Sequence, residues 1–430
     1  MKLLAVCPQF APNTAADGQR LRILAPHLHA RGWEIRVIAA APDTVIYPQD
    51  PLLLQSLGNA VRIDHYQPSQ RGPLHHLGWR SRAPIDALGT QIIRQWQPDV
   101  ALFTTTLFPV MPLARRWQAR HGLPYLIDIQ DMWWVDRAQQ QHKARQRPGG
   151  RLKYAADNWL SRWMEPATLR DAAHVITVSP AYRRILLNRY PHLQPQAVTE
   201  LGFGIPEPDL ALIRRAPQAQ PIFRTGAGKR HWVSVGRGGD DLLPAARQLF
   251  SGLDQLRRQQ PDLPQRLAIH FVGTSYADRD RQQPSFSGLI KAFGLQDLVH
   301  EHPARLPYFQ ALQLLEDADG LLMLGSTDSG YSASKAFSYA LVQRPGLGIL
   351  LPHSPLETRF RELDLGRVVP LGSDGSAAAV MEGLDWLLRQ PRHYPGNPGQ
   401  RQRVSADRQA EQLDQWLRQA IADGSLPAIA

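Results

Sequence analysis

Cysteine is nearly absent from the 430-residue sequence, because Cys7 is its single occurrence. No internal disulfide can form, so a reducing cytosol is the expected location of the protein. The apolar stretch after Lys2 is interrupted by Pro8 and is too short for the apolar core of a secretion signal. No apolar run approaches the roughly 18 residues that a membrane-spanning helix needs. We therefore expect a cytoplasmic protein without a membrane span.

Several common site motifs are also missing. The chain has no GxGxxG, which argues against a dinucleotide fingerprint, and no GK[ST] phosphate loop. It has no HExxH or CxxC, and the adjacent pair His75-His76 has no partners at metal-ligand spacing. No nucleic-acid-binding module is recognisable either. These absences predict a protein with no metal, no organic cofactor and no nucleic-acid partner.

Positive charge is in excess, and arginine supplies most of it. The chain has 49 Lys and Arg residues against 38 Asp and Glu, which gives a net charge of +11. This excess suits a polyanion, an anionic membrane surface or a phosphorylated ligand, and it does not choose among them. Hydrophobic residues make up 43% of the chain, so it is expected to fold, and its length predicts two or three domains.

Short β-rich runs alternate with helical stretches in both halves of the chain. This alternation predicts two parallel sheets with helices on both faces, in two doubly wound, Rossmann-like domains facing across a cleft. A stretch rich in Pro, Gly, Gln and Arg between the halves is typical of a linker. The predicted organisation is an N-terminal domain at 1–205, a linker at 206–230, a C-terminal domain at 231–400, and a terminal segment at 401–430 whose helix packs back on the N-terminal domain.

Ligands of doubly wound sheets bind at the carboxyl ends of strands, which directs attention to the loops that follow them. In VGRGGDD, Gly236 allows a close backbone approach, and Arg237 offers a guanidinium fork suited to phosphate. In PQFAPNTAADGQR, Gly18 allows the same approach, although an ordinary strand–helix loop is an equally good interpretation.

The stretch GYSASKAFSYAL places a lysine at the start of a predicted helix. Ser334 is a natural N-cap, which makes Lys335 the first helical residue. A helix start carries partial positive charge and disfavours a cation, unless an anion such as phosphate is held there. Lys335 and Arg237 would then reach one diphosphate at the ends of two strands, with hydroxyls from Ser332 and Ser334. A lysine that simply points into water is the alternative.

Two further stretches carry candidate side chains. In DIQDMWW, Asp128 and Asp131 follow a predicted strand, and either could act as an acid, a base or a partner of an acceptor hydroxyl. A helix cap or a salt bridge is the competing interpretation for both. Residues 137–163 are first basic and then aromatic, which suits an anionic membrane or a lipid-linked substrate as well as a solvated loop.

Taken together, these motifs resemble glycosyltransferase family 4, whose members have the GT-B fold. The resemblance covers most of residues 1–400. In the first half it is carried by CPQFAPNTAADGQRLRILAPHLHARGWEIRVIAA, PYLIDIQDMW, AAHVITVSPAYRRIL and LGFGIP. In the second half it is carried by VSVGR, VGTSYA and YSASKAFSYALVQRP, and the order and spacing of the strings are more specific than any one of them.

The resemblance implies a nucleotide-sugar donor bound mainly by the C-terminal half, an acceptor bound mainly by the N-terminal half, and retention at the anomeric carbon. It implies donor contacts from one set of residues: Gly18, Gly236, Arg237, Tyr331, Ser332, Ser334, Lys335 and Ser338. It implies that Asp131, Arg237 and Lys335 act in catalysis. Relatives carry glutamate where this chain has Ser338, and a lysine shortly after Gly-Arg that this chain lacks.

The sequence therefore predicts a metal-independent hexosyltransferase that moves a sugar from a nucleoside diphosphate to a hydroxyl acceptor. Bacterial relatives build surface polysaccharides or glycolipids, which implies a saccharide or lipid-linked acceptor and peripheral contact with the inner membrane face. Two alternatives stay open at this stage. One is a nucleotide-sugar epimerase or hydrolase on the same fold, and the other is a non-catalytic nucleotide-sugar-binding scaffold.

Overall fold

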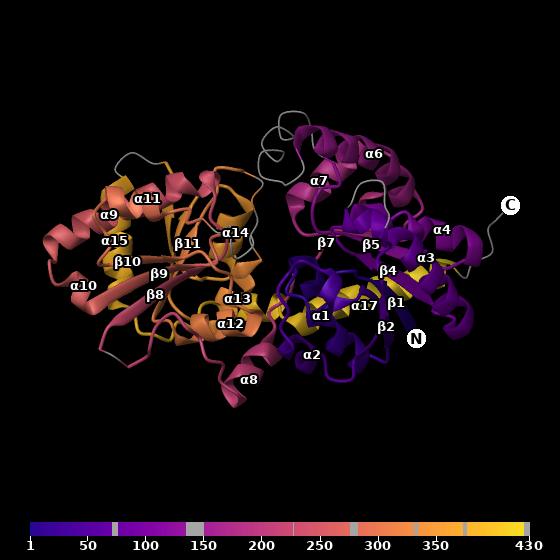
Figure 1. Cartoon of the computed structure of the whole chain (residues 1–430), viewed down its shortest axis with the longest axis horizontal. Helices are drawn as coiled ribbons and strands as arrows, with labels where there is room; N and C mark the ends of the chain where they lie inside the picture. Colours follow the sequence, from indigo (N-terminus) through magenta and orange to yellow (C-terminus); the bar gives the residue numbers. More distant parts are fainter. Residues whose placement is uncertain are drawn as a thin grey trace. The chain divides into compact units, whose positions relative to one another are not determined.

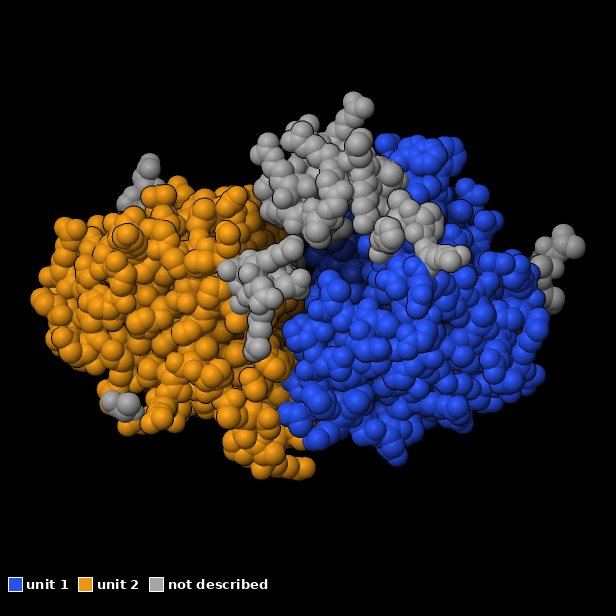
Figure 2. All heavy atoms as spheres, in the orientation of Figure 1, with its two compact units in different colours: residues 1–204, 406–430 blue, residues 205–405 orange. Residues whose placement is uncertain are grey.

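The computed structural model describes residues 1–70, 76–134, 150–226, 228–275, 283–329, 331, 334–372 and 376–424, and for 150–157 and 376 it describes the backbone alone. The chain divides into two compact units (Figure 2). Unit 1 consists of Met1–Gly204 and Ala406–Ala430, and unit 2 consists of Ile205–Ser405. The chain therefore passes between the units twice, and its C-terminal helix returns to the first.

Unit 1 is built on a parallel sheet of seven strands in the order β3-β2-β1-β4-β5-β6-β7. The strands are β1 (Lys2–Val6), β2 (Glu34–Ala40), β3 (Val61–Tyr66), β4 (Val100–Thr104), β5 (Tyr125–Ile129), β6 (His174–Thr177) and β7 (Val198–Glu200). The central strands β1, β4 and β5 are buried almost throughout, as expected for strands covered on both faces. The strand order reverses direction between β1 and β4, which is the switch point of a doubly wound sheet.

The helices of unit 1 connect these strands in chain order. They are α1 (Ala16–Ala30), α2 (Leu52–Leu57), α3 (Leu77–Trp96), α4 (Leu113–His121), α6 (Gly150–Arg170), α7 (Pro180–Arg189) and α17 (Ala406–Gly424), with short 3-10 turns at Pro42–Thr44, Phe108–Val110 and Pro195–Ala197. The terminal helix α17 packs on α1 (Figure 1). There the Trp33 indole N–H donates to Asp414 at 2.7 Å, and Arg31 pairs with Asp407 at 2.9 Å.

Unit 2 repeats the plan with a parallel sheet of six strands in the order β10-β9-β8-β11-β12-β13. The strands are β8 (Arg230–Val235), β9 (Leu267–Val272), β10 (Val299–His302), β11 (Gly320–Leu324), β12 (Gly346–Leu350) and β13 (Gly366–Pro370). Its switch point lies between β8 and β11, which pair through Trp232 and Val233.

The helices of unit 2 are α8 (Glu207–Arg215), α9 (Leu243–Gln259), α10 (Leu263–Arg266), α11 (Ser287–Ala292), α12 (Tyr308–Asp317), α13 (Lys335–Val342), α14 (Pro355–Glu362), α15 (Ser376–Arg389) and α16 (Pro398–Arg403), with a 3-10 turn at Asp240–Leu242. The long helices α9 and α15 pack together over the sheet. The core of the unit is aliphatic and aromatic, and its largest fully buried side chains include Trp232, Phe250 and Phe271. The two doubly wound domains predicted from the alternating pattern are confirmed.

One predicted feature differs in the structure. The segment 206–230, predicted as a linker, begins with helix α8, which belongs to unit 2. Leu210 and Ile213 are buried one turn apart, and the Tyr308 hydroxyl donates to Asp209 at 2.8 Å. The surrounding Pro and Gln content hid this short amphipathic helix, because composition was given more weight than the spacing of the apolar residues.

Candidate functional site

The switch point of unit 2 brings together two loops that the sequence singled out. The loop 236–239 follows β8, and the segment that leads to α13 follows the neighbouring strand β11. Because all strands of this sheet run in parallel, both loops emerge at the same edge. This is the edge at which doubly wound sheets bind ligands.

Lys335 lies directly against the first residue of the glycine-rich loop. Gly236 has a φ of 135°, a backbone conformation that favours glycine. A Cβ atom added at Gly236 would sit 3.5 Å from both Cδ and Nζ of Lys335. The ammonium group of Lys335 is therefore held beside the exposed backbone of the loop rather than directed away from it.

The pKa of Lys335 is lowered to about 8, first by burial and then by the positive charge of Arg237. Arg237 follows Gly236 directly in the chain, and Lys335 lies against Gly236, so both cations stand at the same edge of the sheet. A buried lysine beside another cation is stabilised by a bound anion, which supplies a counter-charge.

Arg237 itself is committed to a carboxylate that the sequence analysis missed. Its Nη1 and Nη2 donate to the two Asp241 oxygens at 2.8 and 2.7 Å, and its guanidinium lies 4.7 Å from the ring centre of Tyr331. Asp241 also accepts from the Ser326 hydroxyl at 2.6 Å. Burial alone would raise the pKa of Asp241, but the hydrogen bonds from Arg237 and Ser326 outweigh it and lower the pKa.

Asp241 thus links the loop after β8 to the loop after β11, since Thr327 also donates its backbone N–H to the Asp241 carbonyl at 3.0 Å. The sequence spacing of Arg237 and Asp241 could have indicated this ion pair, because the two residues stand four apart next to a helix start.

The glycines of the same loop have a packing role as well. A Cβ at Gly238 would lie 2.2 Å from the Ser285 hydroxyl.

The serines near α13 are placed less tightly. Ser334 precedes α13 as predicted, but its side chain makes no capping hydrogen bond. Ser338 is partly buried on the helix, and Ser332 lies outside the described residues. Tyr339, which follows Ser338, is buried. Its hydroxyl accepts from the Val235 N–H at 3.3 Å and donates to the Leu322 carbonyl at 3.1 Å. Tyr339 therefore ties α13 to β8 and β11.

In unit 1, Gly18 lies in the first turn of α1, just after β1. A Cβ there would approach the Gln9 carbonyl oxygen to 2.8 Å, so packing inside unit 1 already requires glycine at this position. The neighbouring Asp17 is buried and does not cap α1. It accepts instead from the backbone N–H of Thr106 at 2.9 Å and the hydroxyl of Thr105 at 3.2 Å.

The two carboxylates of DIQDMWW have different surroundings. Asp128 is the second-last residue of β5, is 1% exposed, and forms an ion pair with Arg20. It also accepts from Thr104 at 2.8 Å and from Gln130 at 2.8 Å. Asp128 is therefore a buried structural anion, and the salt-bridge interpretation holds for it.

Asp131 follows the strand and is partly buried. Its Oδ1 accepts from the Met132 backbone N–H at 2.9 Å and from the Tyr182 hydroxyl at 3.4 Å. Beyond it, Trp134 lies between the guanidinium groups of Arg162 and Arg189, whose central carbons are 4.6 and 3.5 Å from its ring centre. These contacts attach the segment after β5 to α6 and α7.

The described part of the chain lacks two further features. No helix among the described residues combines the length and apolar character that a membrane span requires. Within the same ranges, no group of three or more His, Cys, Asp or Glu side chains is arranged to hold a metal ion.

Comparisons with solved structures show the fold. The glycosyltransferase WaaG, described as involved in lipopolysaccharide biosynthesis, is 16% identical with a TM-score of 0.54, over 99% of this chain and 96% of WaaG. A UDP-GlcNAc 2-epimerase from Methanocaldococcus jannaschii is 11% identical with a TM-score of 0.55, over 97% and 99% of the chains. MnaA from S. aureus, solved with UDP, is 13% identical with a TM-score of 0.51, over 96% and 95%.

A comparison with curated proteins finds no significant match. The comparison with protein-family models is more specific. Residues 18–202 match the model of the glycosyl transferase 4-like domain, and this range spans most of unit 1 before the chain crosses to unit 2. The match confirms the resemblance to glycosyltransferase family 4 for residues 18–202 of unit 1, and the solved structures show that the chain has the two Rossmann-like domains of the GT-B fold.

Proposed function

We propose that this protein is a glycosyltransferase that moves a hexose from a nucleoside-diphosphate sugar to a hydroxyl acceptor. The observation that carries the proposal is Lys335, which lies against the backbone of Gly236 at the switch point of unit 2. A diphosphate at this edge would meet an ammonium group, a glycine backbone and the start of α13. The match of residues 18–202 to a glycosyl transferase 4-like domain supports transfer as the reaction.

Lys335 supplies the net positive charge of the proposed donor site. Arg237 and Asp241 form a bidentate pair that carries no net charge as a whole. Arg237 therefore mainly shapes the loop, and its contact with the donor is proposed to be weaker than that of Lys335, which contacts the diphosphate. As the bond to the sugar breaks, negative charge develops on the departing diphosphate, and a positioned cation stabilises that state more than the ground state. We propose that Lys335 makes transfer independent of a metal ion.

Other donor and acceptor roles extend the proposal. Gly18, Tyr331, Ser332, Ser334 and Ser338 are proposed to contact the donor. Unit 1 is proposed to bind a saccharide or lipid-linked acceptor. Asp131 would orient its hydroxyl, which is compatible with a carboxylate that is only partly buried. We further propose that transfer retains the configuration at the anomeric carbon. The protein would act in polysaccharide or glycolipid assembly, in peripheral contact with an anionic membrane.

Incubation with a panel of nucleoside-diphosphate sugars tests this function. We expect one donor to be consumed in the presence of a saccharide or lipid-linked hydroxyl acceptor, with a glycoside and a free nucleoside diphosphate as products. The same donor should be stable alone, because transfer requires the acceptor hydroxyl. Epimerised donor in the absence of acceptor would instead identify an epimerase. Donor binding without turnover across the acceptor panel would identify a binding protein.

A further inference from the structure

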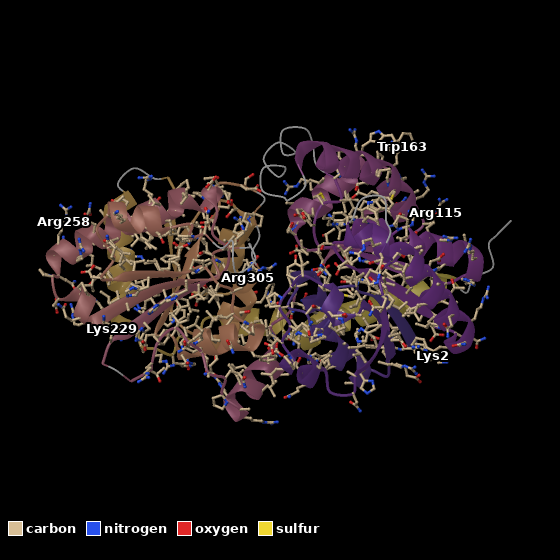
Figure 3. The ribbon with its side chains drawn as sticks, in the orientation of Figure 1. Lys2, Arg115, Trp163, Lys229, Arg258 and Arg305 are labelled. Carbon is tan, nitrogen blue, oxygen red and sulfur yellow. The ribbon has the colours of Figure 1, made fainter. Side chains whose placement is uncertain are left out.

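Helix α6 exposes two tryptophans one turn apart. Trp159 is 60% exposed and Trp163 is 71% exposed, although tryptophan is usually among the well-buried residues. Their rings are 6.3 Å apart between centroids, so the two indoles form one aromatic patch. Figure 3 shows Trp163 on the outer side of the helix. Such a patch costs free energy in water, which indicates that something covers it.

The exposed charged side chains that the structure describes on α6 are positive. Arg162 stands between the two tryptophans in sequence and is exposed, and Arg170 is exposed near the end of the helix. Among the described side chains of α6, the only carboxylate is Glu165, which is fully buried. It accepts hydrogen bonds from Arg189, the last residue of α7, and from Tyr190, which follows it, so its negative charge does not reach the surface.

The patch is held on a fixed support. The Arg162 guanidinium lies 4.6 Å from the ring centre of Trp134, and Glu165 ties the inner side of α6 to α7. Trp134 in turn donates to the Tyr190 hydroxyl at 3.1 Å. Trp159 and Trp163 are therefore presented outward by a helix whose opposite side is anchored in unit 1, and Arg162 is exposed beside them while its guanidinium contacts Trp134. We call these three residues the tryptophan surface.

We infer that the tryptophan surface docks onto an anionic lipid bilayer. Indole rings prefer the headgroup region of a membrane, where the apolar ring and the N–H are both satisfied. Arginines beside them are attracted to anionic headgroups, each contributing about 1 kcal/mol near the surface. The combination of exposed indoles, exposed arginines and an inward carboxylate matches a membrane-surface helix.

This inference names the surface for the membrane contact in the proposed function, but its test uses neither donor nor acceptor. The purified full-length protein is sedimented with vesicles of phosphatidylcholine alone, and with vesicles of equal parts phosphatidylcholine and phosphatidylglycerol. We expect binding to the anionic vesicles, weaker binding to the neutral ones, and a loss of anionic binding at high salt. The double variant Trp159→Ala/Trp163→Ala should bind about tenfold more weakly or worse, because two apolar rings no longer leave water.

Ile46→Ala is the matched control, because Ile46 is 88% exposed in the same unit, and it should bind as the wild type does. The double variant should keep its circular dichroism spectrum and its affinity for nucleoside diphosphate, so a failure of docking is separable from a failure of the donor site. Three results would overturn the inference: no sedimentation of the wild type, equal binding by the double variant, or self-association that disappears in the double variant. The last would show that a second copy covers the patch.

Discussion

Replacing Arg20 by methionine is expected to destabilise unit 1 by about 3–5 kcal/mol, the usual effect of removing one partner of a buried ion pair. Arg20 and Asp128 are 2% and 1% exposed, and Arg20 also donates to the Leu201 carbonyl at 2.8 Å. The variant would leave the Asp128 carboxylate buried without its cation. Burial lowers the pKa of Arg20, and the negative charge of Asp128 opposes this effect, as expected for a cation held inside by its partner.

The double variant Arg20→Met/Asp128→Asn provides the control, because no unpaired charge remains in it. The amide oxygen of the introduced asparagine would still accept a hydrogen bond from Thr104, which now donates to Asp128 at 2.8 Å. We expect hydrogen exchange in peptides from β1 and β5 to accelerate strongly in the single variant and much less in the double variant. Additive destabilisation by the two substitutions would contradict the assignment of a coupled buried pair.

Acidification should destabilise unit 2 through a row of histidines that crosses β8, β9 and β10. His231 Nδ1 lies 3.1 Å from His270 Nε2, and His270 Nδ1 lies 3.4 Å from His302 Nε2. Phe223 stacks on His231 with ring centroids 4.0 Å apart, and His300 faces His270 at 5.4 Å. Each such contact joins neutral rings, and a proton on one ring would place a charge in a site with little solvent.

The charged groups near the row act on the histidine pKa values in both directions: Lys229 opposes protonation, and nearby carboxylates favour it. Burial, and then the neighbouring histidines and Lys229, lower the pKa of His270 to about 3. Burial also lowers the pKa of the other three rings, against the attraction of Asp319 for His231, Asp297 for His300 and Glu301 for His302.

Because the folded-state pKa lies below the unfolded one, the unfolded chain binds protons first. Stability is therefore retained above about pH 6.5 and falls as the pH decreases below it. For His270 alone the loss at about pH 5 is about 2 kcal/mol, since each unit of pKa corresponds to about 1.4 kcal/mol.

Urea unfolding at about pH 7.5 and about pH 5 measures this effect. The variant His270→Gln should lose less stability on acidification than the wild type, by about 2 kcal/mol. His192→Gln, which changes an exposed histidine of unit 1, should show the same acid loss as the wild type. Identical acid losses for His270→Gln and the wild type would show that the row does not govern acid stability.

The fold was largely predictable because its strands are short, apolar and regularly spaced. EIRVIAA and VRIDHY are β-rich runs of this kind, and β2 and β3 are found at these residues. The strands β7 and β10 could not be predicted in this way, because VTE and VHEH are too short and polar to show a period. Both are edge strands, whose position comes from pairing with a neighbour rather than from their own pattern.

The candidate site was predictable only in part, for a related reason. The sequence shows which residues follow a strand, and this was enough to place Gly236, Arg237 and Lys335 at one edge. The sequence does not show which side chains pair within or between loops, so the ion pair between Arg237 and Asp241 was not predicted. Asp128 and Asp131 differ by three positions in a polar run, yet the end of β5 separates them. Asp128 faces the buried Arg20, while Asp131 follows the strand and is partly buried.

The most direct test of the proposed donor site is isothermal titration of nucleoside diphosphates into wild type, Lys335→Met and Lys291→Met. Lys291 is an exposed lysine of the same unit and serves as the matched control. We expect tight binding of one nucleotide to wild type and Lys291→Met, and affinity lower by about tenfold or more in Lys335→Met, as for a lost hydrogen bond to a charged group. Because the free pKa of Lys335 is about 8, binding near this pH should take up a proton and weaken as the pH rises further. Equal affinity of Lys335→Met and wild type for every nucleotide would contradict the proposal that Lys335 holds the donor diphosphate.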